Sequence, residues 1–136
     1  MTAKEFLQQV YLAHRAIDIK LEQIEQLQSL ATRTTTTLKA VPNGSNTFNS
    51  RIESSVVMIQ EKISGLAKEI SNLMAVNEKV AVAIAHVDNS DEKAILEYRY
   101  LCFFSWKEIA RKLKVSLRQV FSLHNRALKN FSRSLQ

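Results

Sequence analysis

Residues 52–87 read IESSVVMIQEKISGLAKEISNLMAVNEKVAVAIAHV, and apolar side chains recur along this stretch every four and three positions. The repeat runs for five heptads, which predicts one long helix with an apolar stripe that packs against another helix. We predict that the a positions of these heptads mediate oligomerisation; they are Val56, Ile63, Ile70, Asn77 and Ile84.

Asn77 is the one polar residue in that series. A buried asparagine at an a position can set the register and the number of helices by pairing with its counterpart or with a backbone carbonyl. Alternatively, Asn77 faces water at a gap in the stripe. The pattern fits both arrangements.

A second apolar repeat with the same spacing occupies residues 3–31, with Lys20 in its one polar slot. Leu7, Leu21 and Leu30 widen this stripe, which indicates more than one packing surface. The repeat consists of Phe6, Val10, Ala13, Ile17, Ile24, Leu27 and Ala31. At 1.5 Å per residue the two helices span roughly 43 and 54 Å, so they can form a long antiparallel hairpin. Because two helices make a thin core, we expect a homodimer, with the long helices paired either within or between chains.

The segment between the repeats, residues 32–51, is predicted to be a linker. It contains four consecutive threonines, which are poor helix formers, and the Pro42-Asn43-Gly44-Ser45 turn signal. A linker near twenty residues is long for a helical hairpin. Residues 1–88 are thus expected to form a helical body with an internal loop.

The composition excludes most other fold classes. Two glycines and one proline in 136 residues are too few for the turns of a β-sandwich or barrel. The glycine-rich loops and Val/Ile strands of a doubly wound α/β enzyme are also missing. The single Cys102 cannot form an intramolecular disulfide, and no apolar run approaches the length of a membrane-spanning helix. We therefore expect an all-α, soluble, cytoplasmic protein without membrane contact.

The net charge of +6 is concentrated near the C-terminus. Residues 1–90 hold nine basic and nine acidic side chains, whereas residues 99–136 hold nine basic side chains and the single acid Glu108. This separation indicates a neutral scaffold joined to a domain that binds a polyanion. The alternative is a solvated basic face that contacts nothing.

Residues 89–136 are predicted to form a helix-turn-helix domain. Ser105 and Glu108 form a capping-box pattern at the start of one helix, and Ser116 with Gln119 repeats it at the start of the next. The small Ala110 allows a close crossing of the two helices. We therefore predict a long helical hairpin in residues 1–88, followed by a helix-turn-helix domain in residues 89–136.

The second helix of this motif is predicted to read double-stranded DNA. Arg and Gln near its N-terminus suit bidentate contacts with guanine and adenine edges. The predicted base-contact residues are Leu117, Arg118, Gln119 and Ser122. The predicted phosphate-contact residues are Arg111, Lys112, Lys114, Arg126, Lys129 and Arg133.

Other reactive side chains do not form a recognisable site. Trp106 is expected to pack between the two helices, and Cys102 to be a small buried residue. Phe121 faces outward and either touches a thymine methyl group or packs against a protein partner. Paired carboxylates, a phosphate loop and a nucleophile–histidine spacing are not found, and the three histidines are too scattered for zinc. The sequence therefore predicts no enzyme, cofactor, metal or small-molecule substrate.

The stretch SWKEIARKLKVSLRQVFSLHNRALKNF, residues 105–131, resembles region four of bacterial sigma factors. The segments EIA, VS, QV and RAL stand in corresponding places, although region four usually has more arginines where Leu117, Phe121 and Ser122 stand here. The whole chain is similar to a phage and prophage family of Gram-positive bacteria that is described as a domain of unknown function and related to phage late-gene regulators. The resemblance implies a bacterial host cytoplasm and a role in transcription.

We expect a phage-type transcriptional regulator that binds DNA through its helix-turn-helix. One alternative is a protein-interaction module that docks host RNA polymerase or another transcription factor. Another is a DNA-packaging protein like the phage small terminase subunit, for which a ring-shaped oligomer is expected.

Overall fold

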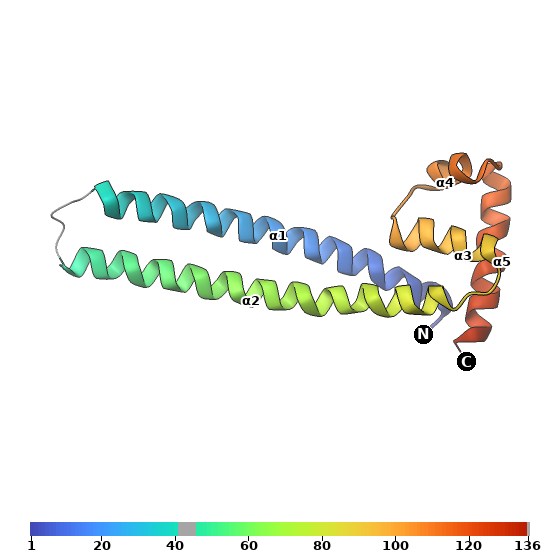
Figure 1. Ribbon diagram of the computed structural model, residues 1–136, viewed down its shortest axis with the longest axis horizontal. Coiled ribbons are helices and arrows are strands. Elements are labelled where there is room, and N and C mark those ends of the chain that lie inside the picture. The colour runs from blue at the N-terminus through green and yellow to red at the C-terminus, as the bar shows by residue number, and fades with distance from the viewer. Residues whose placement is uncertain (41–45, 136) are drawn as a thin grey trace. The chain divides into compact units, whose positions relative to one another are not determined.

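The computed structural model describes residues 1–40 and 46–135, and every regular element in them is a helix (Figure 1). The predicted all-α fold, with a long helical hairpin followed by shorter helices, is confirmed. The elements are α1 (Ala3–Ala40), α2 (Asn46–Ala85), α3 (Ser90–Leu96), the π-helix η1 (Glu97–Leu101), α4 (Trp106–Leu113) and α5 (Leu117–Ser134). None of the helices in these ranges is long and apolar enough to cross a membrane.

The chain divides into two compact units, one made of Met1–His14 with Met74–Gln136 and the other of Arg15–Leu73. Both α1 and α2 pass from one unit into the other. The domain boundary predicted between residues 88 and 89 lies inside the first unit, where the short C-terminal helices share a core with the ends of the long ones.

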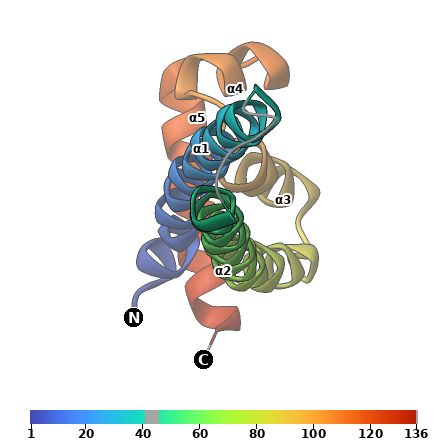
Figure 2. The same ribbon diagram turned by 90° about the vertical axis from the view of Figure 1, so that its left-hand side faces the viewer.

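In the unit Arg15–Leu73, α1 and α2 lie side by side (Figures 1 and 2). The heptad positions of α2 are the covered ones: Ile52 and Ile59 are buried, and Ile63 and Ile70 are half-buried. Lys20, the polar residue in the stripe of α1, reaches across to α2, where its Nζ lies 2.9 Å from Glu69 Oε2. The long helices therefore pair within one chain.

The predicted linker 32–51 is wrong for most of its length, because α1 continues to Ala40 and α2 begins at Asn46. Five threonine hydroxyls donate to carbonyl oxygens four residues earlier; Thr34 bonds to Leu30 at 2.8 Å and Thr35 to Ala31 at 2.9 Å. These bonds satisfy the hydroxyl groups without interrupting the helix, so the weak helix propensity of threonine is overridden. The turn predicted at Pro42–Ser45 lies outside the described residues.

The core of the other unit joins all six elements. Its fully buried side chains come from both ends of the chain and include Leu7, Val10, Val80, Ile84, Ile95, Ile109 and Val120. Of the five predicted oligomerisation positions, Ile84 is therefore fully covered within its own chain, and the other four are half-buried.

Asn77 lies in the apolar stripe rather than in water. Its Oδ1 is buried and accepts no hydrogen bond from any residue that the structure describes. An unpaired buried amide oxygen costs stability, so Asn77 carries a local energetic penalty in the single chain.

Candidate nucleic-acid interface

The first helix of the motif, α4, is fixed by a cap at each end. At its start the backbone N–H of Glu108 donates to Ser105 Oγ at 3.2 Å, and the backbone N–H of Ser105 donates to Glu108 Oε1 at 3.4 Å. This is the capping box that the sequence predicts. At its end Lys114 adopts a left-handed conformation with φ of 59°, and the N–H of Val115 donates to the Ala110 carbonyl at 3.0 Å.

The second helix, α5, begins immediately after this turn. Ser116 Oγ accepts from the N–H of Gln119 at 3.2 Å, and Gln119 Oε1 accepts from the N–H of Ser116 at 2.9 Å. The second predicted capping box is thus also present. Because the Gln119 oxygen is engaged in the cap, only the amide nitrogen of this side chain is free for a contact with a base.

The interior of the motif holds the two helices in a close crossing. Ile109 and Val120 are fully buried, and Ala110 is buried between them, which confirms the role predicted for a small residue. Trp106 packs edge-on against His124 and Phe121, with ring centroids 4.7 and 5.5 Å apart. Trp106 is therefore a packing residue, as predicted.

Arg99 belongs to this packing and not to the exposed basic surface. Its guanidinium lies 4.1 Å from the centre of the Trp106 ring and donates to the Phe104 carbonyl at 3.0 Å. Tyr11 Oη in turn donates to the Arg99 carbonyl. Cys102, next to this cluster, is exposed, so the prediction that it is buried was wrong. It follows the end of η1, where the chain leaves the helix before α4 begins.

A buried polar pair links η1 to α5. Tyr100 Oη lies 2.8 Å from His124 Nε2, and both residues are buried. Burial, followed by the nearby charges of Arg99 and Lys4, lowers the pKa of His124 to about 4. Burial is also the main reason that the pKa of Tyr100 is raised to about 12. The pair is therefore uncharged at neutral pH and serves packing.

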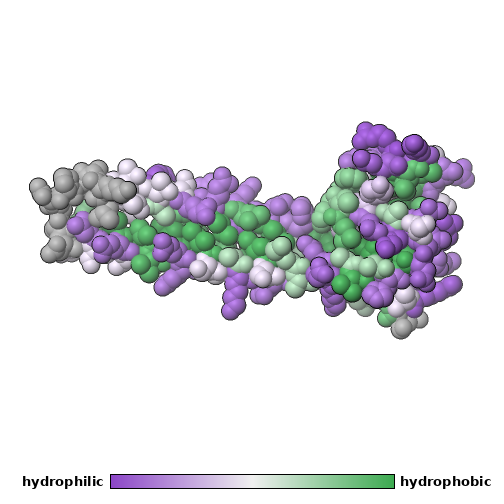
Figure 3. All heavy atoms as spheres, viewed as in Figure 1, coloured by the Kyte–Doolittle hydropathy of each residue, from purple (hydrophilic) through white to green (hydrophobic). Residues whose placement is uncertain are grey.

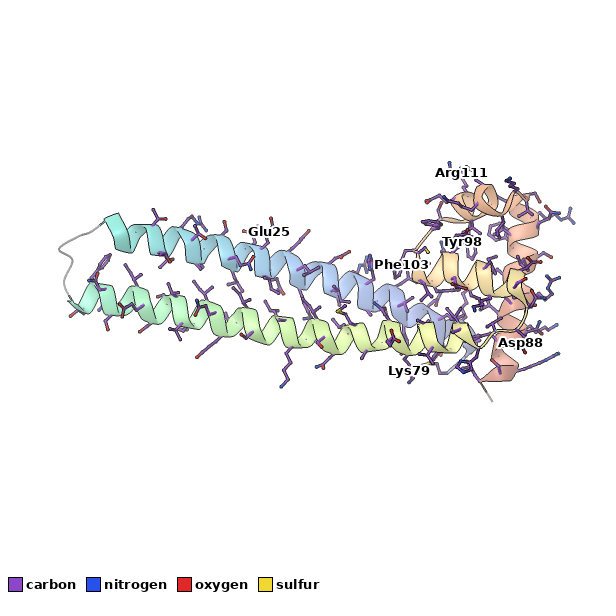
Figure 4. The ribbon with its side chains drawn as sticks, viewed as in Figure 1. Glu25, Lys79, Asp88, Tyr98, Phe103 and Arg111 are labelled. Atoms are coloured by element: carbon purple, nitrogen blue, oxygen red, sulfur yellow. The ribbon has the colours of Figure 1, made fainter. Side chains whose placement is uncertain are left out.

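Five of the six predicted phosphate-contact residues are exposed and free of any ion pair among the residues that the structure describes. They are Arg111, Lys112, Lys114, Lys129 and Arg133. Figure 4 places Arg111 on the outer side of α4. The sixth, Arg126, is exposed but lies with its Nε 3.3 Å from Glu92 Oε1.

Glu92 was not identified from the sequence. It is only 3% exposed, and its Oε1 also accepts a hydrogen bond from Asn130 Nδ2 at 2.7 Å. Acidic residues are common in the first turn of a helix, so nothing in the pattern distinguishes Glu92 from Asp91 beside it. The long-range partner on α5 is what gives Glu92 its role.

The four predicted base-contact residues are all exposed at the start of α5. Leu117 and Phe121 stand one turn apart on the helix, and Arg118 and Ser122 form the neighbouring row. Cations of α4 and of the turn lie close to them in sequence. Within residues 1–40 and 46–135, by contrast, His, Cys, Asp and Glu side chains form no group that could hold a metal ion.

Comparison with known proteins supports this geometry. Residues 89–131 match the family model described as sigma-70, region 4. The match runs from the N-cap of α3 into α5 and so includes α4, the turn and most of α5. No curated protein and no solved structure matches the chain. The predicted resemblance to sigma-factor region four is thus confirmed for this segment.

Proposed function

We propose that this protein is a DNA-binding transcriptional regulator of phage type, which reads double-stranded DNA through α5. The proposal rests on one observation above all: the segment that matches sigma-70 region 4 presents the start of α5 exposed, with the unpaired cations Arg111, Lys112 and Lys114 just before it and Lys129 further along the same helix. A helix-turn-helix places the first residues of its second helix against base edges in the major groove.

The structure supports different roles, base contact and phosphate contact, for the predicted residues. Arg118 is exposed in the first turn of α5 and suits a bidentate contact with guanine. Gln119 contributes less, because its oxygen already closes the helix cap. Arg126 is partly neutralised by Glu92, so the other five cations are the main phosphate contacts.

The long hairpin is proposed to form a homodimer that carries two heads to two DNA half-sites. In the unit Arg15–Leu73 the apolar stripe is mostly half-buried, and Ile19, Leu30 and Met58 remain exposed. Hydrophobic side chains reach the surface along the line between α1 and α2 (Figure 3). A groove of about 930 Å³ runs between these helices, with Ile19, Leu27, Gly65 and Leu66 in its wall and six polar or charged residues beside them: Glu22, Gln23, Glu25, Gln26, Lys62 and Glu69. A second hairpin laid in this groove would complete a four-helix core.

Light scattering of the full chain at micromolar concentration tests the dimer. The expected mass is twice the 15.5 kDa of one chain. Ile19→Glu should shift the protein toward monomer, because it replaces one of the three large apolar side chains of the groove by a charge, whereas Gln28→Glu on an exposed position of the same helix should not. A wild-type protein that is monomeric throughout would remove the dimer from the proposal.

Exposure of Leu117 and Phe121 favours a second candidate, in which the helix-turn-helix docks host RNA polymerase or another transcription factor. A pull-down with the full chain after nuclease treatment separates the two. Polymerase subunits recovered without DNA, together with an absence of specific DNA binding, would favour the protein partner.

The DNA-binding proposal is tested by binding-site selection with the purified full chain, followed by salt titration on the selected and a scrambled duplex. About five phosphate contacts predict a slope of about −4.5 for log affinity against log salt concentration. The selected duplex should also bind more tightly than the scrambled one at every salt concentration. Equal affinities with a shallow slope would contradict the proposal.

A further inference from the structure

Two large apolar side chains are exposed at the start of α5, the part of the helix proposed to face DNA. A helix that bound only phosphate groups would present cations at these positions. Leu117 is 39% exposed and Phe121 is 45% exposed. They are four residues apart and therefore form one row along the helix, which we call the apolar row.

The aromatic member of the apolar row is held by packing against α4. The Phe121 ring packs at 5.5 Å, edge to face, on Trp106, the first residue of α4. Trp106 is itself fixed by the Arg99 guanidinium 4.1 Å from its ring and by His124 at 4.7 Å. The Phe121 ring packs on a tryptophan that is itself held by two neighbours, and it is still nearly half exposed, so it is available for contact with a group outside the chain.

The surroundings of the apolar row identify the class of that partner. Arg118 follows Leu117 directly. Lys114, the residue that caps the end of α4, stands three residues before Leu117, and Arg111 and Lys112 belong to the last turn of α4. The apolar row with cations on its border is complementary to a polyanion that exposes apolar groups between its charged groups. Duplex DNA has this character, because each thymine presents its 5-methyl group in the major groove between two phosphate backbones.

We infer that the apolar row contacts thymine 5-methyl groups in the major groove and makes the DNA site selective for thymine at one or two positions. The inference rests on the proposed function, since it requires α5 in that groove. Four residues advance about 6 Å along a helix, less than two base-pair steps of about 3.4 Å, so Leu117 and Phe121 reach thymines within two base pairs of each other.

The experiment replaces thymines of the selected duplex, one at a time, by deoxyuridine, which keeps the base pair and removes only the methyl group. Binding of the full chain to each duplex is measured at fixed salt for the wild type and for Phe121→Ala and Leu117→Ala. Val82→Ala serves as the matched control, because Val82 is an exposed apolar residue of α2 that lies outside both the helix-turn-helix and the unit Arg15–Leu73. Circular dichroism of each variant checks that it is folded.

At the contacted thymines the wild type should lose about three- to fourfold in affinity, the effect of one buried methyl group. The same replacement should have no effect on Phe121→Ala or on Leu117→Ala at the thymine which that residue contacts, while Val82→Ala behaves like the wild type. If deoxyuridine weakens the wild type and both variants alike, or weakens none of them, the inference is wrong while steep salt-dependent DNA binding leaves the proposed function intact. If the chain does not bind DNA at all, both fail.

Discussion

Glu92 on α3 lies 3.3 Å from the Nε of Arg126 on α5, and its carboxylate is almost completely buried between the two helices. Asn130, one turn further along α5, donates a hydrogen bond to the same oxygen. This carboxylate therefore sets the position of α5 against α3. It also partly neutralises the charge of Arg126, which is exposed on the basic surface.

Removing this carboxylate should destabilise the protein. Glu92→Ala leaves the Asn130 amide without its acceptor, and we expect a loss of about 2–3 kcal/mol in the free energy of unfolding. Asp88→Ala, at an exposed position just before α3, is the matched control and should cost less than about 0.5 kcal/mol. Urea unfolding followed by circular dichroism measures both. Equal effects of the two substitutions would show that Glu92 is an ordinary surface residue.

The buried pair of Tyr100 and His124 should make stability depend on pH. Because the pKa of His124 is lowered to about 4 in the folded protein, the unfolded chain binds this proton more readily. The contribution of His124 is therefore complete above about pH 6.5, the ordinary pKa of histidine, and is lost as the pH falls toward 4. The slope from this group is at most about 1.4 kcal/mol per pH unit.

His124→Gln tests this dependence, since glutamine keeps a hydrogen-bonding group near Tyr100 but cannot bind a proton. The variant should show a flatter profile of unfolding free energy between pH 4 and pH 6.5 than the wild type. His86→Gln, at an exposed position directly after the end of α2, should retain the wild-type profile. If both variants follow the wild type, His124 does not titrate in the way its burial implies.

The long helices and the caps could be predicted from the sequence because both depend on local pattern. Ile52, Ile59 and Val80 recur at helical spacing, and each is buried. Ser105 and Ser116 stand three residues before a Glu and a Gln, and both boxes form. These signals lie within a few residues of the feature that they specify, so no tertiary information is needed.

The linker and the buried polar contacts could not be predicted, for a different reason. Threonine propensity predicts a loop, but the half-buried Thr35 bonds through its hydroxyl to the Ala31 carbonyl of its own helix. Glu92 and His124 take their roles from partners 38 and 24 residues away. Contacts at such separations leave no periodic trace in a single sequence.

Gly65 is expected to limit the stability of the hairpin. It lies within α2, and a Cβ built on it meets no atom within 4 Å. Gly65→Ala should therefore raise the free energy of unfolding by about 0.5–1 kcal/mol, and Ala67→Gly at a neighbouring exposed position should lower it by a similar amount. Thermal unfolding measures both. This gain applies to the single hairpin, and a loss of stability in Gly65→Ala would mean that the second hairpin proposed for this groove packs directly on the glycine.

Lys114 is expected to lower the free energy of unfolding while strengthening the binding of DNA. Its left-handed backbone conformation is unfavourable for a residue with a side chain, so Lys114→Gly should stabilise the protein by about 0.5–1 kcal/mol. The same change removes a proposed phosphate contact and should weaken binding to every duplex. Lys112→Gly, inside α4, removes an equal charge but should destabilise the protein by about 1 kcal/mol. If Lys114→Gly is destabilising, the turn is not under strain at this residue.

Arg118 and Lys129 should have separable effects on DNA recognition, because they stand at different distances along α5 from the turn. Arg118→Ala should reduce affinity for the selected duplex by about 1–3 kcal/mol and narrow the gap to the scrambled duplex, as expected for loss of a base contact. Lys129→Ala should weaken both duplexes alike and reduce the magnitude of the salt slope by about 1, the signature of a lost phosphate contact.

Lys68→Ala is the matched control for both substitutions, since it removes an exposed cation from the unit Arg15–Leu73 without altering the helix-turn-helix. It should leave the affinities and the salt slope unchanged. If Arg118→Ala and Lys129→Ala prove indistinguishable, α5 binds DNA through its charge alone. Sequence preference would then arise from the shape of the duplex, because deformability can select a site without any base contact.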